Sequence, residues 1–173
     1  MGTTKSGRYL NTKGSAKSVS DYALVHSSEG TFTIPSKKGV NLRLKSGGHG
    51  EESIILLKKY NIEYNIVKTY PNGVRIGNVP NHIVKYKRYG IGQTWFPQIW
   101  TNKDIRRAGE HVSSLKTNRS VPDGQIMYGN YKGVRVGVIK TNGNISSVFP
   151  DSDQTSIVRR KRKWVLKKNL RIV

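Results

Sequence analysis

The amino-acid sequence contains no cysteine, which excludes disulfide bonds and thiolate zinc sites. Acidic residues are also scarce: the 173 residues include ten Asp and Glu, and these are too scattered to suggest a metal cage. The sequence has no His-x-x-x-His pair, no nucleophile elbow and no phosphate-binding loop with its lysine. We therefore expect neither a metal nor another cofactor. No apolar run approaches the length that spans a membrane, so we expect no stable membrane insertion.

Basic residues, in contrast, are abundant. The 31 Lys and Arg give a formal net charge of +21 at pH 7 and a pI of about 10.4. Residues 156–173 hold eight basic and no acidic residues, so the rest of the chain still carries +13 (21 − 8). A field of this sign attracts polyanions, and nucleic acid is the first candidate, ahead of anionic membranes and acidic proteins.

The hydropathy pattern predicts an α+β fold, with an N-terminal helical part followed by an antiparallel β-sheet. Composition divides the chain into a polar N-terminal arm or linker at 1–22, a folded domain at 23–152 and a basic C-terminal tail at 153–173. Within the tail, Trp164 stands among basic residues. Charge with an interleaved aromatic ring is typical of arms that grip phosphate and stack on a base, so we expect the tail to bind nucleic acid.

Two segments carry clear helical signals. Residues 51–60 have glutamates at the start and lysines near the end, which complements the helix dipole. Residues 101–115 begin with Thr101 and Asp104 in a pattern typical of a capping box, and their apolar residues follow helical spacing.

Several other segments favour extended structure. Turn residues separate two of them into strand–turn–strand patterns, with Pro-Asn-Gly in the first and Asn-Gly in the second. In the second, strict alternation would place Ile145, Ser147 and Phe149 on one face of the sheet. The predicted extended segments are 22–35 (two short pieces), 62–79, 82–89 and 133–150.

Among the four histidines, His49 is the best candidate for a reacting group. It lies in Ser-Gly-Gly-His-Gly directly ahead of a predicted helix, and its glycine neighbours predict an uncovered imidazole. His111 is expected on an exposed helix face, whereas His26 and His82 lie at a turn and at a strand edge, where either a structural or a functional role is open.

Histidine acid–base chemistry on a cationic surface is sufficient to cleave RNA. One histidine removes the proton of the 2′-hydroxyl, which attacks its own phosphate, and a second protonates the departing 5′-oxygen. Lys or Arg stabilises the charge on the pentacoordinate phosphorus. DNA lacks the 2′-hydroxyl and is not expected to be cut.

Three motifs in order, "SGGHG", "GQTWFPQIWTNKDIRRAG" and "NISSVFPD", resemble the bacterial EndoU nuclease family over roughly residues 8–152. The resemblance implies the α+β arrangement shared with barnase-like and colicin-type RNases. It also implies RNA cleavage that leaves a 2′,3′-cyclic phosphate without requiring a metal. Such domains are toxins of interbacterial competition, delivered into the target-cell cytoplasm, and have a cognate immunity protein as partner.

The resemblance assigns site residues by position. His49 is one member of the histidine pair, and the other is His26, 23 residues upstream, or His82 in reserve. The family has a lysine immediately before its Ser/Thr-aromatic-Phe-Pro motif, where this chain has Gly92-Gln93. Either Lys85, Lys87 or Arg88 takes that role, or the role is absent. The candidate catalytic residues are His49, His26, His82, Lys87, Thr94 and Ser147, and the candidate RNA-binding residues are Phe149, Lys85, Arg88 and Trp164. Phe149 stands where the family has tyrosine; it can stack on a base but has no hydroxyl.

Two other functions fit the same composition. A non-catalytic nucleic-acid-binding module would use the charge and the aromatic residues equally well, but it gives no reason for a histidine between glycines. A membrane-active cationic protein would use the basic, partly apolar tail at 156–173. The aromatic residues of "TWFPQIW" are interpreted as core anchors rather than site residues.

Overall fold

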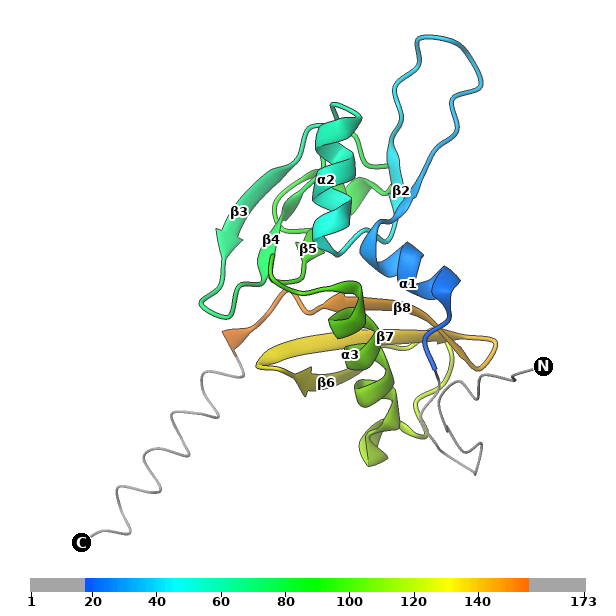
Figure 1. The fold of residues 1–173 in the computed structure, drawn as a ribbon, viewed down its shortest axis with the longest axis vertical. Helices are drawn as coiled ribbons and strands as arrows, with labels where there is room; N and C mark the ends of the chain where they lie inside the picture. The colour runs from blue at the N-terminus through cyan, green and yellow to red at the C-terminus, as the bar shows by residue number, and fades with distance from the viewer. Residues whose placement is uncertain (1–17, 156–173) are drawn as a thin grey trace, which may run out of the picture.

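The computed structural model describes residues 18–155, and these form a mixed α+β fold with three helices and three small antiparallel sheets (Figure 1). The predicted fold class is confirmed. Each sheet joins strands in sequence order, so strands that follow one another in a sheet are antiparallel neighbours. The helices are α1 (Asp21–Ser28), α2 (Glu51–Lys59) and α3 (Asn102–Ser114), with 3₁₀ turns η1 (Lys85–Arg88) and η2 (Lys116–Asn118). The sheets are β1 (Thr31–Phe32) with β2 (Leu44–Ser46); β3 (Asn65–Thr69), β4 (Arg75–Asn78) and β5 (Gln93–Trp95); and β6 (Met127–Tyr131), β7 (Val134–Thr141) and β8 (Asn144–Pro150).

The buried side chains form two hydrophobic clusters. One cluster joins α1 and α3 to the β6–β7–β8 sheet, and the other joins α2 to β2 and β5. Figure 1 shows α3 against the β6–β7–β8 sheet in the lower part of the view and α2 with β3, β4 and β5 in the upper part. The "TWFPQIW" aromatics Trp95, Phe96 and Trp100 are buried in these clusters, which confirms them as core anchors.

Elements with a complete local signal form where the sequence predicts them. Thr101 and Asp104 make a reciprocal capping box at the start of α3, a feature that contributes about 1 kcal/mol. α2 has its acidic residues in the first turn and its lysines in the last, as the dipole favours. The two strand–turn–strand patterns form the β3–β4 and β7–β8 hairpins.

The first part of segment 22–35 is helix α1, so the prediction of an extended piece there was wrong. The helix starts at Asp21, with the Ser20 hydroxyl capping the backbone N–H of Ala23, and Val19 before it is buried. Two of its four buried residues are serines. Ser27 Oγ accepts a hydrogen bond from the backbone N–H of Val148 in β8, 2.9 Å away. Tertiary hydrogen bonds therefore replace the apolar stripe that would reveal a helix in the sequence.

Segment 82–89 does not form the extended strand that the sequence predicts. It contains the 3₁₀ turn η1 within the connection from β4 to β5. Two arginine side chains hold its start: Arg43 donates to the carbonyls of Asn81 and His82, and Arg88 donates to those of His82 and Ile83. These carbonyls bind guanidinium groups rather than a neighbouring strand.

A register shift in β8 changes which residues share a face. Ile145 pairs with Lys140 and Ser147 with Ile139, so Ser146 is the extra residue of a bulge. Ile145 is buried in the core with Val148, whereas Ser147 and Phe149 line a pocket. The prediction that Ile145 lies on the face of Ser147 and Phe149 was therefore wrong.

Candidate active site

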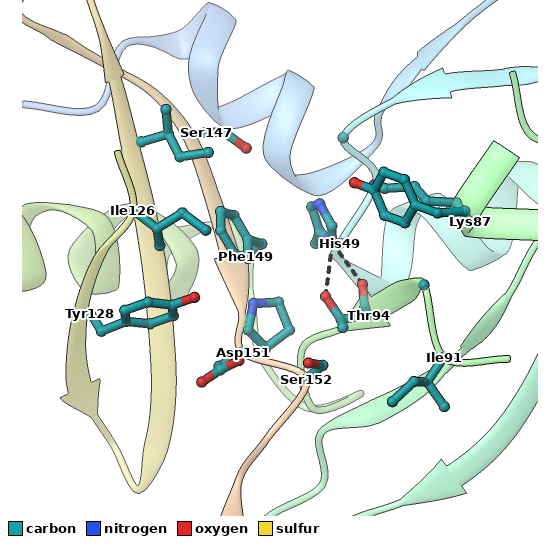
Figure 2. Close-up of a pocket in the computed structure, with 15 residues that line it drawn as sticks. His49, Lys87, Ile91, Thr94, Ile126, Tyr128, Ser147, Phe149, Asp151 and Ser152 are labelled. Atoms are coloured by element: carbon teal, nitrogen blue, oxygen red, sulfur yellow. Dashed lines mark hydrogen bonds between the residues drawn. The ribbon is translucent and has the colours of Figure 1, made fainter. Parts of the chain in front are cut away.

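A pocket of about 480 Å³ lies between the β6–β7–β8 sheet and the part of the chain formed by the 47–49 loop, η1 and β5 (Figure 2). Its two sides differ in chemistry: His49, Lys87 and Thr94 lie on one side, and aromatic and apolar side chains of the sheet lie on the other. The lining residues are Gly47, His49, Tyr86, Lys87, Ile91, Gly92, Thr94, Ile126, Tyr128, Ile139, Ser147, Phe149, Pro150, Asp151 and Ser152.

The glycines before His49 allow the backbone to approach helix α1. Gly47 and Gly48 have left-handed φ angles of +68° and +73°, and a Cβ on Gly47 would stand 2.0 Å from the carbonyl oxygen of His26. The backbone N–H of His49 donates to the Ser27 carbonyl at 2.6 Å, and its own carbonyl accepts from the N–H of Phe96 at 2.7 Å. The loop is thus fixed between α1 and the end of β5.

The imidazole of His49 is 6% exposed, so the prediction of an uncovered ring was wrong although the residue does lie in the pocket. Its Nδ1 is 2.7 Å from the carbonyl oxygen of Thr94 and 3.3 Å from Thr94 Oγ1. A carbonyl oxygen only accepts, so Nδ1 carries the proton of the neutral ring and Nε2 keeps its lone pair. Within residues 18–155 no hydrogen bond occupies Nε2. This tautomer is the one that a general base requires.

The electrostatic environment keeps His49 neutral. Burial lowers its pKa well below the usual 6.5, the charge of Lys87 lowers it further, and His26 and His82 add to this effect. The hydrogen bond to the Thr94 carbonyl acts in the opposite direction. Because the imidazole is unprotonated near neutral pH, it can accept a proton there.

Lys87 is the cation of the pocket. It projects from η1, and burial lowers the pKa of its ammonium group to about 8, so it is still mostly charged at pH 7. No carboxylate among the described residues pairs with it. Of the three predicted cations, Lys85 is exposed outside the pocket, and Arg88 binds the carbonyls of His82 and Ile83. The structure therefore favours Lys87 for the lysine role.

His26 lies immediately behind the 47–49 loop, on the side of α1. Its ring Cε1 is 3.0 Å from where a Cβ on Gly47 would stand, and its Nδ1 is 3.4 Å from Thr31 Oγ1. The ring is half-buried and does not line the pocket. Burial, and then the charge of Lys87, lower its pKa. His26 and His49 are close enough for a charge on one to lower the pKa of the other.

His82 is fully buried and does not line the pocket, so its contacts are structural. Its Nδ1 accepts a hydrogen bond from the backbone N–H of Val84 at 2.8 Å, so Nε2 carries the proton, and this atom is buried without a partner among the described residues. Burial, followed by the charges of Lys87, Arg88 and Arg43, lowers the pKa of His82 to about 4. A neutral, buried ring of this kind fixes the loop that carries Lys87.

This environment predicts a loss of stability in acid. Between pH 6.5 and 4 the unfolded chain protonates His82 while the folded chain does not, so stability falls as the pH falls through this window. The loss attributable to His82 is at most about 3 kcal/mol. Asn at position 82 can still accept from the Val84 N–H but does not titrate. We expect the unfolding free energy of His82→Asn, measured with urea at pH 7 and pH 4.5, to decline less than that of the wild type. Equal declines would contradict this assignment.

The sheet side of the pocket contains residues that the sequence analysis missed. Tyr128 in β6 and Phe149 in β8 both pair with Gly137 of β7, so they lie in one row across the sheet. The Phe149 ring covers Gly137, where a Cβ would stand 2.6 Å from the ring, and it lies 5.7 Å from the His49 ring. The predicted residues Ser147 and Phe149 are thus brought to the same pocket as His49, Lys87 and Thr94.

Tyr128 is held in place by a charged pair. The Arg135 guanidinium lies 4.3 Å from the centroid of the Tyr128 ring and binds Asp151, with Nε 2.7 Å from Oδ2. Burial, and then the charge of Asp151, raise the pKa of the Tyr128 phenol, which therefore keeps its proton. The sequence analysis missed β6, although a two-residue turn, Lys132-Gly133, joins it to β7 and both turn residues have positive φ angles.

The remaining predictions concern the surface and the chain ends. His111 is exposed on α3, as predicted. Trp164 lies outside the described residues. Over residues 18–155 no group of three or more His, Asp or Glu side chains is arranged to hold a metal ion. No helix within the same range has the length and apolarity needed to cross a membrane.

Comparison with known families identifies the class of this chain. The bacterial EndoU nuclease family matches residues 23–152 of 173. The chain therefore belongs to that family and is a nuclease. No curated protein and no solved structure matches it.

Proposed function

We propose that the pocket cleaves RNA by histidine acid–base transphosphorylation and leaves 2′,3′-cyclic phosphate and 5′-hydroxyl ends, without requiring a metal. The observation that carries this proposal is the state of His49: a neutral imidazole in the pocket with its Nδ1 proton held by the Thr94 carbonyl and its Nε2 available. RNA supplies its own nucleophile, so no nucleophilic side chain is needed.

In the first half of the reaction, His49 Nε2 removes the proton from the ribose 2′-hydroxyl. The 2′-oxygen forms a bond to phosphorus, and the bond from phosphorus to the 5′-oxygen breaks. Lys87 shares the pocket, and its ammonium group stabilises the additional negative charge on the phosphoryl oxygens. The low-dielectric surroundings that lower the Lys87 pKa also strengthen this attraction.

His26 is the proposed general acid, because it adjoins the His49 loop on the side of α1. Its ring lies behind Gly47, which lines the pocket, so it would donate a proton to a departing 5′-oxygen bound on that side. In the free enzyme its pKa is lowered, but a bound phosphate would raise it by attracting the imidazolium. The Thr94 carbonyl fixes the tautomer of His49, because this oxygen is closer to His49 Nδ1 than the Thr94 hydroxyl is.

The sheet side of the pocket would hold the nucleobase. Phe149 offers a face on which a base can stack, and Ser147 and Tyr128 offer hydroxyl groups at its edge. Phe149 stands where the family has tyrosine and has no hydroxyl, so Tyr128 would supply the phenol hydroxyl of the pocket.

We further propose that the chain is a toxin domain that acts in the cytoplasm of a competing bacterial cell and is neutralised by a cognate immunity protein. The three-motif resemblance supports this role, and the excess of basic residues suits an acidic partner. Induced expression in a bacterial cytoplasm is expected to stop growth, whereas expression of a His49→Gln variant is not. Normal growth with the wild-type protein present and soluble would contradict the toxin role.

The nuclease mechanism is tested with two oligonucleotides of the same sequence, one all-RNA and one with a single 2′-deoxy residue at the mapped cleavage position. We expect the deoxy substitution to abolish cleavage at that position and leave binding nearly unchanged. Cleavage of both at similar rates would overturn the proposal, because the 2′-hydroxyl would then not be the nucleophile.

A further inference from the structure

The 3₁₀ turn η1 and the residue after it carry two exposed aromatic rings among cations. The sequence of this segment, 85–89, is Lys-Tyr-Lys-Arg-Tyr. Tyr86 is 68% exposed and Tyr89 is 71% exposed. Tyrosine is more often packed at least on one face, so two open rings on one turn are unusual and need an explanation. The proposed cleavage step uses neither ring.

The backbone under these rings is firmly held. Below the turn, Val79 and His82 are fully buried, and the N–H of Val79 donates to the Lys87 carbonyl at 3.0 Å. The Asn78 amide donates to the Gly90 carbonyl at 2.9 Å. The two arginines that bind the carbonyls of residues 81–83 complete the anchoring. The exposed rings therefore extend from a fixed loop, which lowers the entropy that a ligand would lose on stacking against them.

The segment leads out of the pocket. Tyr86, Lys87 and Ile91 line it, whereas Lys85 and Tyr89 do not. The turn ends at Arg88, and Tyr89 follows it in an extended conformation, three residues after Tyr86. This segment thus carries one exposed tyrosine at the pocket and a second outside it, and Lys85, exposed next to Tyr86 in the sequence, offers a charge for a phosphate.

We propose that Tyr86 and Tyr89 are a stacking platform for unpaired nucleotides that adjoin the cleaved phosphate. This inference rests on the proposed ribonuclease function. Aromatic rings interleaved with cations bind single strands without reading their sequence, because every base has a face to stack. Duplex RNA keeps its bases stacked on one another and offers no such face.

Tyr89→Ala tests the platform, because Tyr89 lies outside the pocket and its exposed ring contributes little to folding. On a heptanucleotide with one cleavage site, we expect kcat/KM to fall about tenfold, in line with the loss of one stacked base. On the dinucleotide that contains the same site, kcat/KM should not change. Tyr89→Phe keeps the ring face and should restore the wild-type rate. Tyr22→Ala is the matched control, because Tyr22 is 83% exposed on α1 outside the pocket and should tolerate the change.

Two outcomes would overturn the platform: an unchanged rate of Tyr89→Ala on the heptanucleotide, or equal losses on both substrates. A separate measurement distinguishes failure of the platform from failure of the ribonuclease mechanism. Fluorescence anisotropy with a 2′-O-methyl heptanucleotide, which this reaction cannot cleave, should show about tenfold weaker binding by Tyr89→Ala even if the wild type cuts no RNA. Equal binding by wild type and Tyr89→Ala would contradict the platform whatever the cleavage result.

Discussion

His49→Gln is expected to lower the rate of RNA cleavage by at least about a thousandfold while leaving RNA binding within about twofold, because a positioned base contributes up to about ten-thousandfold to such a step. Glutamine is chosen because its side-chain amide can still donate to the Thr94 carbonyl that now accepts from Nδ1. The cavity and the loop are thus preserved, and the proton acceptor at Nε2 is removed. Single-turnover cleavage of a labelled oligonucleotide measures the rate, and anisotropy measures binding.

The matched control is His111→Gln. His111 is exposed on α3 and does not line the pocket, so this variant should cleave at the wild-type rate. A His49→Gln protein that folds normally and cleaves within tenfold of the wild type would remove His49 from the mechanism.

Lys87→Met should lower the cleavage rate by about a hundredfold or more, comparable with the loss of one preorganised group that stabilises an oxyanion. Methionine keeps most of the apolar stem of the side chain, so the loss reports the charge. The same substitution should also change the pH dependence. The positive charge of Lys87 lowers the pKa of both His49 and His26, so removing it lets both values rise.

The sign of the pH shift follows from the roles of the two histidines. The base must be neutral and the acid protonated, so kcat/KM against pH forms a bell whose limbs report their pKa values. Because the pKa values of both histidines are lowered, we expect both limbs of the wild-type profile below the ordinary histidine value of 6.5. In Lys87→Met the whole bell should move to higher pH. Lys87→Arg keeps the charge and should leave the bell near its wild-type position. A bell that does not move in Lys87→Met would contradict the placement of Lys87 beside the two imidazoles.

Local sequence signals predicted the elements that are stabilised locally. The capping pair of α3, the charge distribution of α2 and the Asn-Gly hairpin each act within a few residues, and all three elements form as expected. Helix α1 was missed because its buried face includes Ser27 and Ser28, whose partners lie far along the chain. Segment 82–89 was misread as a strand because its β-branched and aromatic residues favour one, whereas the guanidinium contacts of Arg43 and Arg88 that hold its start are not visible in the sequence.

The candidate site was also predicted only in part, because some of its residues lie in local motifs and others are selected by tertiary structure. His49, Thr94, Ser147 and Phe149 lie in motifs, and the fold brings them to one pocket. The choice of Lys87 over Lys85 and Arg88 required the structure, because three neighbouring cations differ only in the direction that the turn gives them. The function of the glycines before His49 was also invisible in the sequence. The absence of a side chain at Gly47 leaves room for the His26 carbonyl and does not expose the His49 ring.

The chemical identity of the new RNA ends tests the central claim most directly. A defined oligonucleotide is cleaved by the purified full chain in the presence of a chelator, and the products are weighed by mass spectrometry. The mechanism predicts a 2′,3′-cyclic phosphate on one fragment and a 5′-hydroxyl on the other, at a rate that the chelator does not change. Fragments with a 3′-hydroxyl and a 5′-phosphate, or a complete loss of cleavage in chelator, would contradict it.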